Sequence, residues 1–170
     1  MNRLFVKICG VTTVRDAVHA VNLGADAIGL NFYSKSPRCI SINRAKTIVA
    51  ALPPFIWIVG IFVNETQRSI ENICRAVKLD VAQLHGTESP TFARKLKMRT
   101  MKAIAVRDAS IDVVAHRYAN ADAIVLDAAQ SGFGGGGITF DWRLARRVAK
   151  KQPVLLAGGL TPENVAEAVR

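Results

Sequence analysis

The chain has 170 residues, half of them hydrophobic and only 6% aromatic, and its formal net charge is +10. This length suffices for one domain with a sizeable core, and no apolar run approaches the roughly eighteen residues that a membrane-spanning helix needs. The opening MNRLFVKICG lacks the long apolar region and cleavage site of a secretion signal. Three cysteines form no CxxC pair and no zinc spacing, so we expect a reduced, cytoplasmic protein with no metal and no membrane partner.

The basic charge suits either a small anionic substrate or a nucleic acid. Much of it lies in segments such as DWRLARRVAKKQP, whose alternation of apolar and basic residues is typical of a helix with a solvated basic face. An RNA-binding protein would add exposed aromatic residues along a basic groove, but most of the seven phenylalanines lie in predicted strands or in the sequence FDW. We therefore expect no nucleic-acid partner and keep a basic RNA-binding protein as an alternative.

Apolar, β-branched runs alternate with segments of helical period along the whole chain. Strands are predicted at 4–8, 27–32, 56–63, 80–84, 100–105, 123–127 and 154–157. Helices are predicted at 13–23, 43–52, 66–77, 89–97, 109–118, 141–151 and 162–170. Capping residues support several boundaries: Thr66 or Ser69 begins the third helix, Ser89 the fourth and Thr161 the seventh, and Gly24 ends the first.

Strands that are apolar throughout and separated by helices predict a parallel sheet covered on both faces. No GxGxxG follows the first strand, which argues against a dinucleotide-binding fold. We predict an α/β fold of the (β/α)8 TIM-barrel type with only seven βα units in this chain, and a flavodoxin-like open sheet is the alternative. Such barrels need eight units and about 200 residues, so we expect residues 1–170 to be a single, C-terminally incomplete barrel domain.

Chemistry in such barrels takes place at the carboxyl ends of the strands. Cys9 directly follows the first predicted strand, where its thiolate could be exposed to a ligand; the alternative is a small, inert packing residue. Cys39 and Cys74 are expected to be buried and inert.

Asp127 closes an apolar strand, ADAIVLD, where a carboxylate is costly unless it is hydrogen-bonded or neutral. It is a candidate proton donor, and a helix N-cap or a loop salt bridge is the alternative. His85 closes the fourth strand, but a single histidine at a strand end is too little for a metal-dependent sugar-phosphate epimerase.

Three segments could bind anionic groups. Gly158 and Gly159 end the seventh strand just before a predicted helix, an arrangement that offers backbone donors to phosphate. Gly135 lies in a run of four glycines that is either a plain loop or an anion-binding one. Arg38, in the sequence SPR, could hold a carboxylate with both arms of its guanidinium.

Six segments resemble the phosphoribosylanthranilate isomerase family in the same order: KICGVT, GLNFYSKSPRCI, VGIFVN, QLHGTE, LDAAQSGFGGGGITFDW and LAGGLTPENV. The resemblance implies a cofactor-free aldose–ketose isomerase of tryptophan biosynthesis. Its reaction is the Amadori rearrangement of N-(5-phosphoribosyl)anthranilate to 1-(2-carboxyphenylamino)-1-deoxyribulose 5-phosphate. It also implies that Cys9 is the general base, Asp127 the general acid and Arg38 the ligand of the anthranilate carboxylate.

The remaining substrate-binding candidates are His85, Gly135, Gly158 and Gly159, and we expect a monomer or a homodimer. The sequence departs from the family pattern at Gly136, which stands where a threonine or serine is usual. The family's eighth unit, with its second phosphate-binding loop, is also missing from these 170 residues. An inactive barrel fragment is therefore a further alternative.

Overall fold

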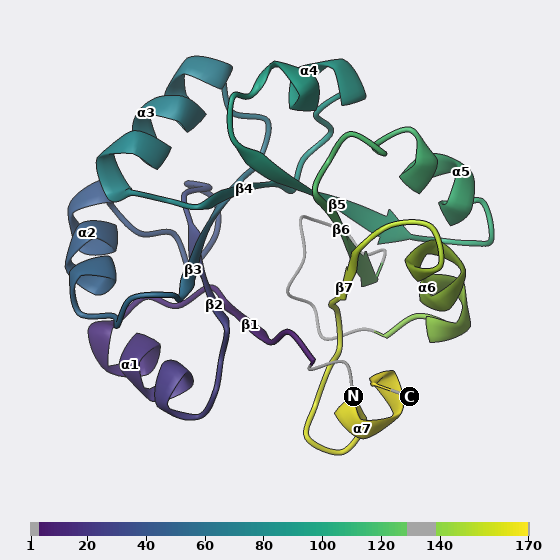
Figure 1. Ribbon diagram of the computed structural model, residues 1–170, viewed down its shortest axis with the longest axis horizontal. Helices are drawn as coiled ribbons and strands as arrows, with labels where there is room; N and C mark the ends of the chain where they lie inside the picture. The colour runs from purple at the N-terminus through teal and green to yellow at the C-terminus, as the bar shows by residue number, and fades with distance from the viewer. Residues whose placement is uncertain (1–3, 129–138, 170) are drawn as a thin grey trace. The chain divides into compact units, whose positions relative to one another are not determined.

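The computed structural model describes residues 4–128 and 139–169, in which seven strands alternate with seven helices (Figure 1). Their contacts group them into two compact units, residues up to 83 together with 96–99, and residues 84–95 together with those from 100 onward. No helix in the described ranges is long and apolar enough to cross a membrane. The expectation of a single, incomplete barrel domain stays a prediction.

The first unit contains four strands and three helices. In chain order they are β1 (Lys7–Cys9), α1 (Val14–Asn22), β2 (Ala27–Asn31), α2 (Ile42–Ala50), β3 (Trp57–Phe62), α3 (Gln67–Val77) and β4 (Val81–Leu84, of which Leu84 belongs to the second unit). β1 pairs in parallel with β2, and β2 pairs in parallel with β3. In a flavodoxin-like sheet the first strand would lie between the second and the third, so this pairing shows that the alternative fold is wrong.

The helices of this unit lie on one face of its strands (Figure 1). Ile28 and Leu30 of β2 pack with Ile58 of β3 against Ala17 of α1 and Ile48 of α2. Because successive side chains of a strand point to opposite faces, the intervening positions of β2 face away from this apolar layer.

The second unit contains three strands and four helices. They are α4 (Pro90–Lys95), β5 (Arg99–Val106, of which Arg99 belongs to the first unit), α5 (Ile111–His116), β6 (Ala123–Ala128), α6 (Trp142–Ala149), β7 (Val154–Leu156) and α7 (Val165–Ala168). β6 pairs in parallel with β5 on one side and with β7 on the other. Ile124 and Leu126 of β6 pack against Ile111 of α5 and Val148 of α6.

The predicted caps explain where two helices begin, and a side-chain contact explains why the last begins late. The Thr66 hydroxyl accepts the Ser69 N–H before α3, and the Ser89 hydroxyl accepts the Phe92 N–H in α4. α7 begins only at Val165, not at 162, because Asn164 folds the preceding residues into a turn. Its side chain accepts the Thr161 N–H at 2.7 Å and donates to the Gly159 carbonyl at 2.8 Å.

An aspartate stands immediately before β2, β4 and β6, and its carboxylate binds the backbone at the start of the preceding strand. The bonds run from Val6 N–H to Asp26 at 2.9 Å, from Ile58 N–H to Asp80 at 2.7 Å and from Thr100 N–H to Asp122 at 2.7 Å. The N–H of each aspartate donates in return to the carbonyl of the residue whose N–H its carboxylate accepts, at 2.8–2.9 Å. These paired bonds fix the register of each even-numbered strand against its predecessor.

We predict that Asp80→Ala lowers the free energy of unfolding by about 1–3 kcal/mol, the usual cost of leaving a buried donor unsatisfied, because the buried Ile58 loses the acceptor of its N–H. Asp80→Asn keeps an acceptor oxygen in place and should lose less. Urea denaturation of the two variants measures the difference. Equal stabilities of Asp80→Ala and the unchanged chain would show that water replaces the carboxylate without cost.

Candidate active site

Cys9 is the last residue of β1 and its side chain is exposed. It pairs with Gly29 of β2, and a Cβ atom on that glycine would lie 3.1 Å from the Cys9 Cα and 3.2 Å from its Sγ. Both distances are tighter than ordinary van der Waals contact, so the missing side chain of Gly29 is what leaves room for the thiol. Cys9 therefore sits at the carboxyl end of its strand in a position that a ligand can reach.

The Arg38 side chain lies across Gly10, the residue after Cys9. A Cβ atom on Gly10 would lie 2.7 Å from the Arg38 Cδ, and Gly10 also has φ +78°, a conformation that side chains disfavour. The loop that carries Arg38 is held by the end of β2: Asn31 accepts the Tyr33 N–H at 2.8 Å and donates to the Ser36 hydroxyl at 3.1 Å, which in turn accepts the Arg38 N–H at 3.2 Å. The first unit thus brings the predicted base and the predicted carboxylate ligand together.

Asp127 lies near the carboxyl end of β6 and is only 7% exposed. Its Oδ1 accepts the Ala128 N–H at 2.9 Å, and its Oδ2 lies 3.6 Å from Nε2 of His85. The alternative that Asp127 caps the next helix is wrong, because Asp141 caps α6. The second unit therefore brings the predicted acid and the strand-end histidine together.

Gly158 packs directly on this carboxyl group. A Cβ atom there would collide with Oδ1 of Asp127 and would lie 2.7 Å from the Ala128 nitrogen. Gly158 and Gly159 both have positive φ, +82° and +63°, so the loop after β7 requires glycine at this point for conformation as well as for space. α7 is four residues long and begins only at Val165, so the contact with Asp127 is made by the glycine turn and not by the helix. Gly135 lies outside the described residues.

The other two cysteines differ from each other. The expectation that Cys39 is buried is wrong: it is exposed, because the loop after β2 runs beside the end of that strand and makes an isolated bridge with Asn31. Cys74 is buried in α3 as expected, and burial, assisted by the negative charge of Glu71, raises the pKa of its thiol from 9.0 to about 12. In residues 4–128 and 139–169, no group of three or more histidine, cysteine or acidic side chains could hold a metal ion.

We predict that iodoacetamide at pH 8 modifies Cys9 and Cys39 in the folded protein and leaves Cys74 unmodified. The raised pKa lowers the thiolate fraction of Cys74 by about 10³-fold relative to an ordinary thiol, and burial blocks access. Peptide mapping by mass spectrometry reads the modified sites, and the urea-denatured chain, in which all three should react, is the control. Rapid labelling of Cys74 under native conditions would contradict the burial described here.

The chain is similar to known proteins over nearly its whole length. The family model for N-(5′-phosphoribosyl)anthranilate isomerase matches residues 6–170. The isomerase of Neisseria gonorrhoeae is 48% identical, over 100% of this chain and 82% of its own. The crystal structure of phosphoribosylanthranilate isomerase from Thermotoga maritima has a TM-score of 0.92 at 40% identity, over 98% of this chain and 82% of that one.

A further crystal structure shows phosphoribosylanthranilate isomerase in complex with reduced 1-(o-carboxyphenylamino)-1-deoxyribulose 5-phosphate. It has a TM-score of 0.88 at 38% identity and covers 98% of this chain and 81% of that one. These likenesses confirm the predicted barrel-type α/β fold. The chain belongs to the N-(5′-phosphoribosyl)anthranilate isomerase family, the isomerases of tryptophan biosynthesis.

Proposed function

We propose that Cys9 and Asp127 are the general base and the general acid of this isomerase. In the proposed course, the Asp127 carboxyl group donates a proton to the furanose ring oxygen, and the ring opens to a Schiff base. The Cys9 thiolate then removes the proton from C2′ to give an enolamine, which tautomerises to the ketone product. The first two steps each move one proton between a side chain and a substrate atom, which is general acid–base catalysis. In the tautomerisation the C2′ hydroxyl loses a proton and C1′ gains one.

The observation that carries this proposal is the environment of Asp127. A carboxyl group that is 7% exposed at the carboxyl end of a strand, with an imidazole at 3.6 Å and a glycine packed on it, has little packing value of its own. Burial of an ionised carboxylate is costly, so a carboxyl group kept in this place is a candidate for a functional group rather than a packing residue. Cys9 complements it because the base has to be reachable by a substrate carbon, and its side chain is exposed.

The remaining site residues are proposed to bind the substrate's charged ends and its sugar. Arg38, held beside Cys9 through Asn31 and Ser36, would bind the anthranilate carboxylate by charge-assisted hydrogen bonds. Gly158 and Gly159 would offer backbone N–H groups to the phosphate, as would Gly135. His85 would contact the sugar next to the acid, since it already contacts the Asp127 carboxylate.

This assignment gives the net charge of +10 a role in attracting a substrate that carries both a carboxylate and a phosphate. We propose a small-molecule substrate rather than a nucleic acid, cytoplasmic location, and a monomer or homodimer. A gel shift on generic RNA at increasing salt tests the nucleic-acid alternative, because phosphate binding by a basic surface weakens steeply with salt.

We predict that Cys9→Ala and Asp127→Asn each lower kcat by at least about 10²-fold, the usual scale for losing a positioned acid or base. The change in KM should be small, because neither substitution removes a charge that pairs with the substrate's carboxylate or phosphate. The assay follows the loss of anthranilate-adduct fluorescence, and circular dichroism checks that each variant is folded. Full activity of Cys9→Ala would make Cys9 a packing residue, and full activity of Asp127→Asn would transfer the acid role elsewhere.

We predict that Gly158→Ala lowers kcat by about 10-fold or more, because its methyl group would displace the Asp127 carboxyl group. Gly24→Ala is the matched control. Gly24 also has positive φ, +96°, but no atom lies within 4 Å of the point that its Cβ would occupy. Both variants should lose about 1 kcal/mol or more of stability from backbone strain, and only Gly158→Ala should lose activity. Equal activities of the two variants would mean that Asp127 tolerates the displacement.

A further inference from the structure

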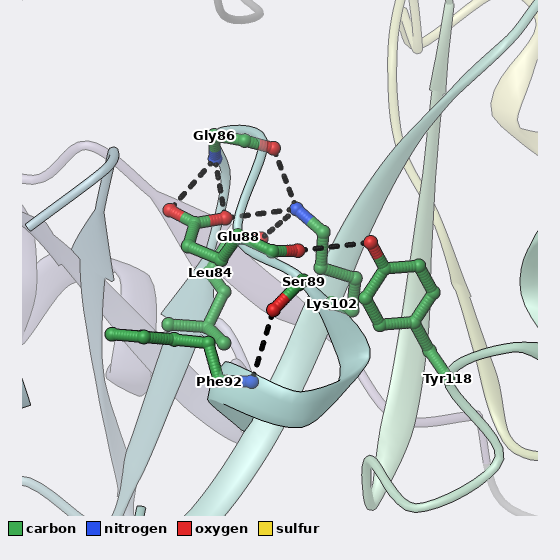
Figure 2. Close-up of polar contacts among 7 residues, drawn as sticks. All are labelled: Leu84, Gly86, Glu88, Ser89, Phe92, Lys102 and Tyr118. Atoms are coloured by element: carbon green, nitrogen blue, oxygen red, sulfur yellow. Dashed lines mark hydrogen bonds and ion pairs between the residues drawn. The ribbon is translucent and has the colours of Figure 1, made fainter. Parts of the chain in front are cut away.

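Lys102 and Glu88 form a buried ion pair next to the turn that follows His85 (Figure 2). Lys102, in the middle of β5, is 3% exposed, and its Nζ lies 3.0 Å from Oε2 of Glu88, which is also buried. The hydroxyl of Tyr118 donates to the backbone carbonyl of Glu88 at 2.9 Å, and the Lys102 ammonium lies 5.8 Å from the centre of the Tyr118 ring. None of these three side chains has a part in the proposed proton transfers.

The strand register places this pair on the opposite face of the sheet from the acid. Lys102 of β5 pairs with Ile124 of β6, and Ala105 pairs with Asp127. Ile124 belongs to the apolar layer that packs on α5 and α6, and paired residues of parallel strands share a face while successive ones alternate. Lys102 is therefore on the helix side of the sheet and Asp127 on the other side. Any effect of the ion pair on Asp127 has to act through the loop at residues 84–86, which the Lys102 side chain contacts.

The pair binds the backbone on both sides of His85. The Lys102 ammonium donates to the Leu84 carbonyl at 3.1 Å and to the Gly86 carbonyl at 2.7 Å, and both oxygens of Glu88 accept the Gly86 N–H, at 3.1 and 3.0 Å. An ammonium group has three N–H donors, and Leu84, Gly86 and Glu88 supply one acceptor for each. Figure 2 shows these bonds converging on the turn that Gly86 and Glu88 form.

Stability alone does not account for such a pair. Burial lowers the pKa of Lys102, against the opposing effect of the Glu88 charge, which shows that the charged form is held at a cost. Apolar residues of similar volume in place of a buried ion pair are often as stable or more stable. What apolar side chains cannot supply is a fixed set of bonds to the carbonyl groups of residues 84 and 86 and to the N–H of residue 86.

We propose that Lys102 and Glu88 are positioning residues that aim the His85 imidazole at the Asp127 carboxyl group. Fixing the peptide groups before and after His85 leaves its side chain few directions, and the direction present brings Nε2 to 3.6 Å from the acid. The inference rests on the proposed function, because it assigns His85 a part in catalysis beside Asp127.

The test is a double-mutant cycle on kcat, in which Lys102→Met/Glu88→Gln is introduced into the unchanged chain and into His85→Ala. Removing both charges avoids leaving one of them buried without a partner. In the unchanged chain we expect kcat to fall about 10-fold or more with little change in KM, the scale on which misplacement acts. In His85→Ala the same pair of substitutions should change kcat by less than about twofold, because the group being positioned is already gone.

The matched control is Asp112→Asn/Arg147→Met, which removes another ion pair of the second unit, one that joins α5 to α6. It should lower the melting temperature without a comparable loss of kcat. If Lys102→Met/Glu88→Gln does not fold, Glu88→Gln alone, which keeps an acceptor for the Gly86 N–H, enters the same cycle.

Equal factors in the two backgrounds would overturn the positioning role and leave the proposed function intact. Unchanged kcat in His85→Ala alone would instead remove His85 from the proposed function, and the positioning inference with it.

Discussion

Parallel pairing is the constraint on which the site depends. A strand that pairs in parallel with the one before it has to be reached through a crossover, so the carboxyl ends of paired strands meet at the same edge. β1, β2 and β3 obey this in the first unit, and β5, β6 and β7 in the second. Cys9 closes β1, and Asp127 is the penultimate residue of β6. The amino ends carry the aspartates that fix strand register. These stabilising bonds and the proposed site residues therefore lie at opposite ends of the strands.

Three glycines lie where a side chain would collide with the proposed site residues. Gly29 leaves room for the Cys9 thiol, Gly10 for the Arg38 side chain and Gly158 for the Asp127 carboxyl group. In each case a Cβ atom would lie about 3 Å or less from the functional residue or the atoms that hold it. Such close approaches make the position of Cys9, Arg38 and Asp127 depend on residues that have no side chain.

The sequence predicted the order of the elements, because apolar periodicity and local caps such as Thr66 and Ser89 act within a few residues. Strand-end positions also made Cys9 and Asp127 candidate site residues, and the structure has both at or next to the carboxyl end of a strand. The sequence did not predict that Asp26, Asp80 and Asp122 fix strand register, because each binds a residue far along the chain; Asp80 and its partner Ile58 are 22 residues apart. Lys102 and Glu88 were missed because two charged residues 14 positions apart look like surface residues until strand register places them in the interior.

Loops that leave a sheet edge lose the hydrogen-bond ladder that holds a strand, so the site needs another source of rigidity. In the described part of the chain, three loops with a proposed role each have at least one polar side chain that binds their backbone. Asn31 and Ser36 hold the Arg38 segment, Lys102 and Glu88 hold the peptides beside His85, and Asn164 binds the Gly159 carbonyl. Such bonds matter because a displacement of 1 Å at a reacting group can cost about 10²-fold in rate. The proposed roles of Cys9, Arg38 and Asp127 therefore depend on these loop-holding side chains as well as on the three residues themselves.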